Sequence, residues 1–398
     1  MTHIEQMIQD MCPNGVEFKK LGEVTTIIRG ERVTKSQLIE NGQYPVVSGG
    51  VNPMGYIDKY NREENTITIA QYGSAGFVNY INEKFWANDV CYSVYPNEEL
   101  INKFLYYYLV HKQGYFYAVR NTDAVPYSIA LEKIKDLDTP IPPLEIQKKI
   151  VECLDKFSAL AAELQAELQM RRKQYEYYRT QLLTPHSDCN SATKPDDAQW
   201  EWKTLGEIGE MIKGSGIQKS DFVEEGKPCI HYGQVHTFYG TFAYKNKSYI
   251  SEELYAKCKK AHTGDLVIAT TSEDVEACCK ATAWLGDEDV AVSGDAHIYR
   301  HTQNPKYMAY LFQTEMFAQQ KRRCATGAKV TRVHGDDMLK FRFPLPSLAE
   351  QERIVSILDK FEALTTSLSD GIPAEQAAQQ KRYEYYRDLL LTFDRKAV

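Results

Sequence analysis

One pattern constrains the fold of this chain more than any other: a long amphipathic segment that occurs twice. Between residues 144 and 184, apolar side chains recur at alternating steps of four and three, and only Arg171 interrupts this heptad seam. Prolines flank the segment and none lies inside it, so a single helix about 60 Å long is expected. Such a seam must be buried against a partner helix.

The chain supplies this partner itself, because residues 348–393 repeat the pattern. The sequence LDKF at 154–157 returns at 358–361, and YEYYR at 175–179 returns at 383–387. The offset between the copies is 204 residues for the first block and 208 for the second, so four residues are inserted near Pro373. Four extra residues shift a heptad seam, and a proline cannot continue a straight helix. The second helix is therefore expected to be kinked or broken there.

The connectivity also predicts how the helices pair. The first helix carries the chain from one domain to the next, so a second helix that packs on it must return. An antiparallel coiled coil with an approximate twofold axis is expected, and tyrosines at heptad spacing belong to its core rather than to base-stacking platforms. The residues expected in the coiled-coil core or at a docked partner are Ile150, Leu154, Phe157, Tyr175, Tyr178, Ile354, Leu358, Phe361, Tyr383 and Tyr386.

The rest of the chain alternates short β-rich runs with turns, which predicts an α+β fold. Strands are expected at 24–28, 44–47, 66–70 and 90–94, and a helix at 101–110. The expected architecture has two strand-rich globular domains separated by the pair of long helices. The expected segments are a first domain at 1–140 with a short helix at 3–11, the first long helix at 141–185, a polar linker at 186–199, a second domain at 200–346 and the second long helix at 347–398.

Composition narrows the class of protein. A net charge of −7 argues against a wholly basic binder but permits a nucleic-acid binder whose cations gather on one face. Nine cysteines, an odd number without C-x-x-C spacing, are interpreted as reduced thiols of a cytoplasmic protein. Neither a signal peptide nor a membrane span is expected.

Catalytic motifs are weak. Asp196 with Glu201 and Lys203 imitates a nuclease site, but this Asp lies in the expected linker and has no counterpart in the first repeat. His297 and His301 fall on an expected strand, where they would lie too far apart to share a metal. The chain has no phosphate-binding P-loop and no methyltransferase signature.

The start of each domain and of each long helix also repeats. The sequence LGE at 21–23 returns at 205–207, and a proline-rich entry at 139–145 returns at 343–351. Together with two dissimilar domains and two similar helices, these motifs resemble the specificity subunit of type I restriction-modification systems. The resemblance covers nearly the whole chain. A minor departure is Ile146 in the first copy where the second has Glu350.

The resemblance implies a DNA-binding protein that does no chemistry. Each domain would read half of a bipartite site on double-stranded DNA. The helices would space the domains and dock two adenine-N6 methyltransferase subunits, and translocase-nuclease subunits would join. S-adenosylmethionine, ATP and Mg would bind to those partners, and the chain itself would need no cofactor and no metal. A rigid helix pair about 60 Å long would set the distance between the two domains, and it would limit the whole DNA site to roughly 17 base pairs.

Cations are the first candidates for DNA contact, because Lys and Arg both neutralise phosphates and both can also donate to guanine. The second domain has five within twelve residues and no acid between them; the alternative is a solvated helix end. They are Lys321, Arg322, Arg323, Lys329 and Arg332. A second basic loop near the start of each domain contains Arg29, Arg32 and Lys35 in the first domain and Lys213 and Lys219 in the second.

Polar residues of the first domain complete the expected interface. Arg120 and Asn121 align with the basic cluster of the second domain. The loop at 71–76 contains Gln71, Tyr72 and Ser74 between glycines that would let the backbone approach DNA, although a plain turn is an equal alternative. Residues 270–272 stand near the same place in the second domain.

Two other classes of protein remain open. A structural adaptor would use the coiled coil to assemble partners without reading DNA sequence. An autonomous nuclease would cleave DNA by itself in the presence of a metal. Neutralising the basic cluster distinguishes an adaptor from a DNA-binding subunit, because an adaptor would keep its partners and lose nothing else. Metal-dependent cleavage of DNA by the chain alone would identify a nuclease.

Overall fold

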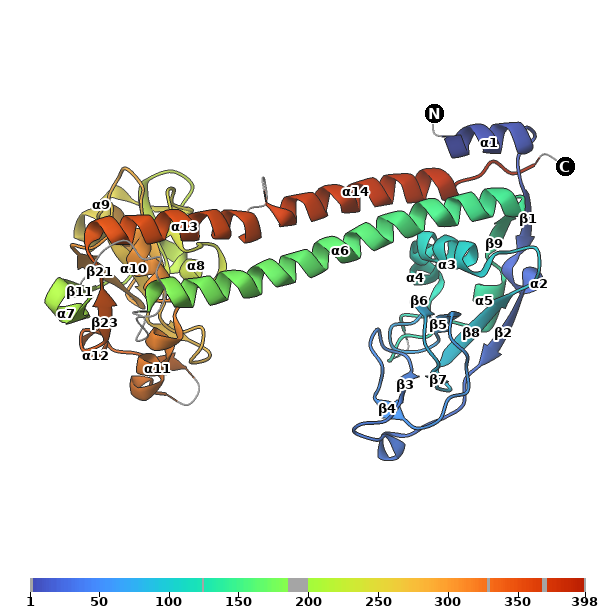
Figure 1. Cartoon of the computed structure of the whole chain (residues 1–398), viewed down its shortest axis with the longest axis horizontal. Coiled ribbons are helices and arrows are strands. Elements are labelled where there is room, and N and C mark those ends of the chain that lie inside the picture. The colour runs from blue at the N-terminus through green and yellow to red at the C-terminus, as the bar shows by residue number, and fades with distance from the viewer. Residues whose placement is uncertain (1–2, 124, 185–199, 328–329, 367–370, 397–398) are drawn as a thin grey trace, which may run out of the picture. The chain divides into compact units, whose positions relative to one another are not determined.

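A computed structural model of the chain describes residues 3–123, 125–184, 200–327, 330–366 and 371–396 (Figure 1). The chain forms two compact units. Unit 1 contains Met1–Gln165 and Glu375–Val398, and unit 2 contains Ala166–Ala374. The long helix α6, Leu144–Leu183, contributes its first part to unit 1 and its second part to unit 2. The expected linker at 186–199 lies outside the described residues.

Unit 1 is built on an antiparallel four-stranded sheet in the order β2-β8-β5-β6. Its strands are β2 (Thr25–Arg29), β8 (Cys91–Pro96), β5 (Thr66–Ala70) and β6 (Val78–Ile81). A smaller sheet has the order β4-β3-β7, with β4 (Tyr56–Ile57), β3 (Tyr44–Val47) and β7 (Trp86–Ala87). The helices of the unit are α1 (His3–Met11), α2 (Leu21–Val24), α3 (Asn102–His111), α4 (Gln113–Val119) and α5 (Leu131–Lys135). The strands and helix expected from sequence periodicity are confirmed within two residues.

Unit 2 repeats this sheet and adds a strand, in the order β11-β21-β17-β19-β14. The strands are β11 (Gly209–Lys213), β21 (Ala296–His301), β17 (Leu266–Ala269), β19 (Lys280–Trp284) and β14 (Phe242–Ala243). A second five-stranded sheet contains β12 (Phe222–Val223), β15 (Ser248–Ile250), β13 (Lys227–Ile230), β20 (Val290–Val292) and β16 (Lys260–Ala261). Its helices before α13 are α7 (Leu205–Ile208), α8 (Tyr232–Thr237), α9 (Glu252–Lys257), α10 (Pro305–Leu311), α11 (Glu315–Cys324) and α12 (Gly335–Met338).

The repeated motifs at the domain starts have a common structural role. In unit 1, β1 (Glu17–Lys20) pairs antiparallel with β9 (Asp138–Ile141), the strand that leads into the long helix. In unit 2, β10 (Glu201–Thr204) pairs in the same way with β23 (Arg342–Leu345). The LGE motif forms the short helix that follows each first strand, α2 or α7, and its leucine is fully buried. Each unit therefore closes its first strand onto its last.

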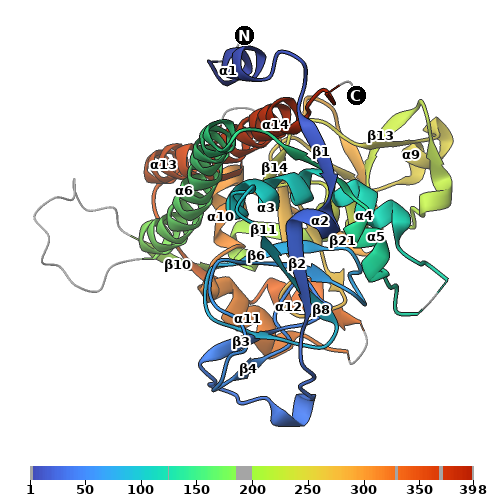
Figure 2. The same ribbon diagram turned by 90° about the vertical axis from the view of Figure 1, so that its right-hand side faces the viewer.

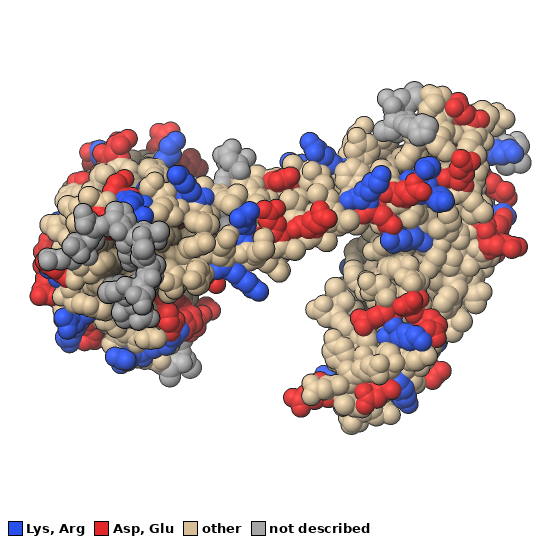
Figure 3. Space-filling model, in the orientation of Figure 1, with Lys and Arg blue, Asp and Glu red and all other residues tan. Residues whose placement is uncertain are grey.

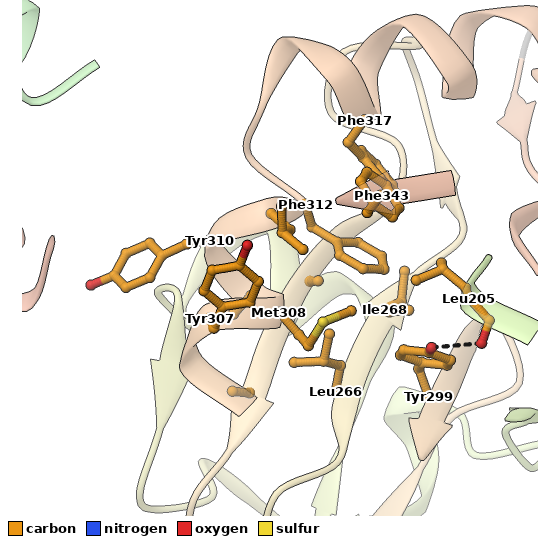
Figure 4. Close-up of a cluster of buried hydrophobic side chains, with 14 of the residues drawn as sticks. Leu205, Leu266, Ile268, Tyr299, Tyr307, Met308, Tyr310, Phe312, Phe317 and Phe343 are labelled. Carbon is orange, nitrogen blue, oxygen red and sulfur yellow. Dashed lines mark hydrogen bonds between the residues drawn. The ribbon is translucent and has the colours of Figure 1, made fainter. Parts of the chain in front are cut away.

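The core of unit 2 lies between its main sheet and the helices that follow it (Figure 4). Met308 and Tyr307 of α10 pack over Leu266 and Ile268 of the sheet. The buried Tyr299 hydroxyl donates to the Leu205 carbonyl at 2.8 Å, so its polar atom is satisfied inside the core. Each fully buried large side chain stabilises the fold by roughly 2 kcal/mol.

The helix pair is antiparallel in unit 1. Phe157 of α6 stacks on Tyr386 of α14 (Ile372–Leu391) with ring centroids 5.3 Å apart, and Gln165 accepts a hydrogen bond from Gln376 at 3.0 Å. Residue numbers rise along α6 as they fall along α14, and both views show the two helices side by side (Figures 1 and 2).

Unit 2 uses the same contact with the roles exchanged. Phe361 of α13 (Leu348–Thr366) stacks on Tyr178 of α6 at 5.5 Å and on Tyr175 at 6.4 Å. The LDKF block of one helix thus packs on the YEYYR block of the other. Four apolar side chains of the seam are buried as expected: Ile150, Leu154, Ile354 and Leu358. These four side chains belong to the hydrophobic cores of the globular parts. Tyr178 keeps 40% of its surface exposed, and its other contacts include the ring of Phe361.

The predicted interruption of the second long helix is also confirmed. The structure describes two helices, α13 and α14, and Gly371 lies in a bend between them. Pro373 is the second residue of α14, in the first turn of a helix, where its missing N–H would have had no partner in the helix.

Candidate nucleic-acid interface

Several candidates of unit 1 that are far apart in the sequence meet at one end of its main sheet. The register pairs Arg29 with Tyr92 and Ala70 with Cys91, so the ends of β2 and β5 lie at the same end of the sheet. The next residues along β5 continue this edge, because Tyr72 forms a β-bridge with Ser128. Three segments therefore form one surface at this end of the sheet: the basic loop after Arg29, the loop at 71–76 and the segment after Arg120. We call this surface the edge.

Unit 2 has the same arrangement. Lys213 pairs with His297, and Ala269 pairs with Ala296, which places the ends of β11 and β17 together. The strand β18 (Thr271–Ser272) then pairs with β22 (Thr331–Arg332). The structure thus joins the basic cluster of the second domain to residues 270–272, which the sequence places near the position of the first domain's loop at 71–76.

A pair of bridged segments closes the edge in each unit, and we call it the edge hairpin: residues 120–123 with 125–129 in unit 1, and 325–327 with 330–333 in unit 2. Asn121 and Ser128 exchange two backbone hydrogen bonds of 2.7 and 3.2 Å, and Thr326 and Arg332 exchange two of 2.9 and 2.8 Å. Residues 124 and 328–329 lie outside the described residues, and Lys329 is one of them. The two hairpins share a backbone frame and present different side chains.

The edge hairpins are anchored to their sheets at matching positions. Ile129 donates its N–H to the Gln71 carbonyl at 2.9 Å, and Val333 donates to the Thr270 carbonyl at 3.2 Å. This pairing makes Gln71 the counterpart of Thr270, and Ser128 the counterpart of Arg332. Because the backbone frame is fixed, side chains can differ between the units without moving the edge.

The first cation of the unit 1 hairpin, Arg120, is held by aromatic rings. Its guanidinium carbon lies 4.8 Å from the ring centroid of Tyr117 and 4.8 Å from that of Tyr127. Both tyrosines are exposed, at 40% and 42%. Two such contacts each contribute about 0.5–1 kcal/mol at exposed sites, enough to restrict the rotamers of the arginine.

The loop at 71–76 has the backbone that a close turn needs. Gly73 and Gly76 have φ values of 75° and 84°, a region that other residues rarely adopt. Ser74 donates its N–H to the Gly49 carbonyl, and Tyr72 is 37% exposed. The Gln71 side-chain oxygen is buried and has no hydrogen-bond partner among the described residues.

The basic loop near the start of each domain is exposed and partly fixed. Arg29 donates from Nε to the Asp89 carbonyl at 2.6 Å, while Arg32 and Lys35 are exposed. Lys213 and Lys219 are exposed in unit 2. The glycine that follows the first cation is required in both units, because a Cβ on Gly30 or Gly214 would lie 2.1 Å from a backbone oxygen.

The prediction for Lys321 is wrong: its ammonium group does not face solvent. Lys321 is 4% exposed and donates to the carbonyl oxygens of Glu276 at 2.8 Å and Cys278 at 3.0 Å. A cation that is buried and bonded in this way stabilises the fold and is removed from the surface that DNA would meet. Sequence alone gives no sign of this, because the two acceptors are backbone atoms more than forty residues away.

Arg322 is exposed, but its charge is matched. It forms ion pairs with Glu276 at 2.9 Å and Glu315 at 2.7 Å. The cluster that has no acid within the sequence therefore has two beside it in space. Arg323 and Arg332 are exposed, and within the described part of the chain their side chains have no hydrogen-bond or ion-pair partner.

The pocket beside this edge in unit 2 does not suit a phosphate. It has a volume of about 1230 Å³ and is lined by Thr271 and Ser272, and also by the carboxylates Glu273, Asp274 and Glu276. Lys280 lines it too, but it donates to two carbonyl oxygens, and burial lowers the pKa of its ammonium group. Carboxylates at the rim would repel a polyanion.

Charge is interspersed over each unit on the face that Figure 3 shows, and neither sign covers it. His297 pairs with Lys213 across the sheet, and burial together with the charge of Lys213 lowers the pKa of the imidazole. No cluster of three or more His, Cys, Asp or Glu side chains that could hold a metal exists in the described ranges. The eight cysteines within these ranges are free thiols. None of the described helices is both long and apolar enough to cross a membrane.

Sequence reasoning missed the residues that fasten each globular part to its long helix. Gln147 is fully buried; it accepts from the Ile101 N–H at 2.8 Å and donates to the Pro142 carbonyl at 2.8 Å. Gln351 makes the matching bonds, accepting from the Asn304 N–H at 3.0 Å and donating to the Pro346 carbonyl at 3.0 Å. A polar residue repeated at the same place of both proline-rich entries was the available signal.

A second fastening uses the aspartate of the LDKF block. Lys103 and Tyr107 of α3 bond to the two carboxylate oxygens of Asp155, at 2.7 and 2.5 Å. Lys306 and Tyr310 of α10 bond to Asp359 at 2.5 and 2.8 Å. Burial, followed by the bond to Asp155, raises the pKa of Tyr107, so this phenol remains a hydrogen-bond donor at neutral pH.

Comparison with known families fits this repeated architecture. The family model described as type I restriction modification DNA specificity domain matches residues 13–170 and again 198–376. The chain belongs to this family of specificity subunits. A protein of Haemophilus influenzae named as a type I restriction enzyme specificity subunit is 32% identical over 98% of both chains. The EcoR124I/EcoR124II specificity subunit of Escherichia coli is 36% identical over 64% of this chain and 61% of its own.

The chain shares its fold with a solved specificity subunit. The type I restriction-modification S subunit of Mycoplasma genitalium aligns with a TM-score of 0.55 and 18% identity, covering 94% of this chain and 95% of the other. The family is one of non-catalytic subunits that confer DNA sequence specificity. The expected α+β fold and the expected role in DNA specificity are confirmed.

Proposed function

We propose that each unit reads one half of a bipartite site on double-stranded DNA with its edge hairpin and the loops beside it. The observation that carries this proposal is the repeated edge, where segments distant in sequence converge on one frame with different side chains. Arg120 with Asn121, Gln71, Tyr72 and Ser74 are the proposed contacts of unit 1, with support from Arg29, Arg32 and Lys35. For unit 2 we propose Lys213, Lys219, Arg323 and Arg332, with a minor contribution from Arg322.

The long helices provide the proposed docking surface for methyltransferase subunits. The middle tyrosine of each YEYYR block supports this, because Tyr177 is 61% exposed and Tyr385 is 64% exposed, whereas Tyr175 is 9% exposed. Aromatic side chains of this kind are enriched at protein interfaces. Two methyltransferase subunits and the translocase-nuclease subunits would carry S-adenosylmethionine, ATP and Mg, and the assembly would act in the cytoplasm.

Selection from a library of randomised duplexes tests the DNA proposal. The full-length chain should enrich two short motifs at a fixed separation, and each mismatched base pair should cost about 1–3 kcal/mol. With about six phosphate contacts, affinity should fall roughly 1000-fold between 50 and 200 mM salt. A scrambled duplex of the same length is the control. Equal binding to both duplexes at physiological salt would contradict the proposal.

An adaptor that assembles partners without reading DNA is the second candidate, and the exposed tyrosines are its only specific support. Replacing both Arg323 and Arg332 by Ala separates the two. A specificity subunit should lose affinity for DNA and keep its binding to a methyltransferase subunit in a pull-down. An adaptor would lose neither.

A further inference from the structure

Arg120 differs from the other candidate cations in how firmly it is held. The Tyr117 ring comes from α4 and the Tyr127 ring from the far side of the edge hairpin, and the guanidinium lies over both. The Nε atom is buried and has no hydrogen-bond partner among the described residues. The contacts fix the stem and the plane of the side chain without using its donors.

The charge of Arg120 is also unmatched. In the described residues no carboxylate forms an ion pair with it, whereas Arg322 has two such partners and Arg29 donates to a carbonyl. A pre-positioned guanidinium with free donors loses little conformational entropy when it binds an acceptor. Such an arrangement favours a planar acceptor pair over diffuse attraction to the DNA backbone.

We propose that Arg120 reads a guanine in the half-site of unit 1, with its two terminal N–H groups donating to O6 and N7. This inference rests on the proposed function and adds to it a base and a position. Among the four bases only guanine presents two acceptors side by side in the major groove, and that groove admits two paired extended segments such as those that Asn121 and Ser128 join by backbone hydrogen bonds. The contacts of Arg120 with Tyr117 and Tyr127 hold the guanidinium in one orientation, as bidentate recognition of a base requires.

The tertiary repeat limits this contact to one half of the site. Arg120 precedes Asn121, the first residue of the bridge, and the residue at that place in unit 2 is Ala325. The second half-site is therefore read without this contact. It provides an internal control, because any variant of Arg120 should leave its motif unchanged.

The test is a duplex selection with the full-length wild-type chain and with Arg120→Lys, which keeps the charge and loses the fork. The wild-type motif should contain an essential G·C pair in one half. The Lys variant should lose discrimination at that pair by roughly 10- to 100-fold. The second half-motif and the salt dependence should stay as in the wild type, since the charge is retained. Tyr127→Leu, which removes one ring, should weaken discrimination at the same pair, and Tyr127→Phe, which keeps the ring, should not.

Each other outcome is informative. A uniform loss of affinity over all sequences with Arg120→Lys would identify a phosphate contact and overturn the inference. Unchanged preference at every position would overturn it too, with the proposed function left intact. Failure of the wild-type chain to enrich any bipartite motif would reject the proposed function itself. Thermal unfolding of each variant, which should match the wild type within a few degrees, shows that the loss is not one of folding.

Discussion

At the scale of single residues, cations that look alike in the sequence have different roles in the structure. Lys321 is buried and bonded to two carbonyl oxygens, Arg322 is matched by two carboxylates, and Arg323 is exposed without a partner in the described chain. Their positions on α11 decide this, because three consecutive residues of a helix point in directions about 100° apart. Only one of the three is a free surface charge.

Replacement of these cations should therefore separate stability from binding. Lys321→Ala should lower the free energy of unfolding by about 1–3 kcal/mol, because two buried carbonyl groups lose their donor. Arg323→Ala should leave it within about 0.5 kcal/mol. In DNA binding, Arg323→Ala should reduce the salt slope by about one. Urea unfolding measures the stability of each variant, and titration with salt measures the salt slope of its DNA affinity. A Lys321→Ala variant as stable as the wild type would contradict the structural role of Lys321.

A buried histidine makes stability depend on pH. Burial is the main cause that lowers the pKa of His301 to about 4 from its ordinary value of 6.5, and the Asp265 charge opposes it only in part. Between these values the unfolded chain binds a proton that the folded chain does not, so stability falls as the pH drops from about 7 to 4. The loss should approach roughly 3 kcal/mol.

The variant His301→Asn isolates this effect. The amide oxygen of Asn can replace Nδ1, which accepts from the Gln303 N–H at 3.2 Å. Unfolding in urea at pH 7 and at pH 4.5 should show a smaller difference in the variant than in the wild type. An identical pH dependence of the two proteins would assign the acid sensitivity to other groups.

At the scale of elements, the long helices are fastened twice to the globular part that precedes them. A buried glutamine bonds to the backbone at the start of α3 or α10 and to the proline-rich entry. An aspartate about two turns further along the long helix receives a lysine and a tyrosine. These contacts explain physically why the proline-rich entry and LDKF recur within the chain. The residues that join a globular part to its long helix are the same in both copies of the repeat, whereas the residues at the edge differ between the copies.

Removing the glutamine should weaken this junction. Gln351→Ala leaves the partly buried Asn304 N–H and the buried Pro346 carbonyl unpaired, and it should lower the free energy of unfolding by about 2–4 kcal/mol. The exposed Gln376→Ala on α14 is a matched control and should cost less than about 0.5 kcal/mol. Equal effects of the two variants in denaturant unfolding would show that burial of the amide is not important.

At the scale of the whole molecule, two units follow one topology and share a single continuous helix. The main sheets have corresponding strand orders, and each ends in an edge hairpin anchored in the same way. The net charge of −7 and the interspersed surface charge mean that DNA affinity has to come from local edges rather than from the field of the whole protein.

Exchange of one globular part should consequently change one half of the DNA site. Replacing residues 200–346 with the aligned segment of the Haemophilus influenzae relative should give a new second half-motif and leave the first unchanged. Gln351 and the LDKF block lie after the exchanged segment, so the host keeps these two parts of the junction. Duplex selection reads out both halves, and a change in the first half-motif would show that the two units do not read independently.

Much of the fold could be predicted because it depends on local patterns. The helix seam, the break near Pro373, the strands of unit 1 and the internal repeat all follow from spacing and turn residues, and the structure agrees with them. The candidate site was predicted less well. Arg120, Gln71 and Arg332 lie at the edges, but Lys321 is buried. The support from Tyr117 and Tyr127 depends on contacts across a hairpin that spacing does not reveal.

The sequence by itself determined the two-fold recurrence of a strand-rich domain and a long helix, and the antiparallel pairing of the two long helices, because hydrophobic periodicity and repetition are present along the chain. Only the tertiary structure decided which cations are free. That outcome depends on partners brought close by folding: the carbonyl oxygens at Lys321, the carboxylates at Arg322 and the aromatic rings at Arg120. Charge is a property of the residue, but its availability is a property of the fold.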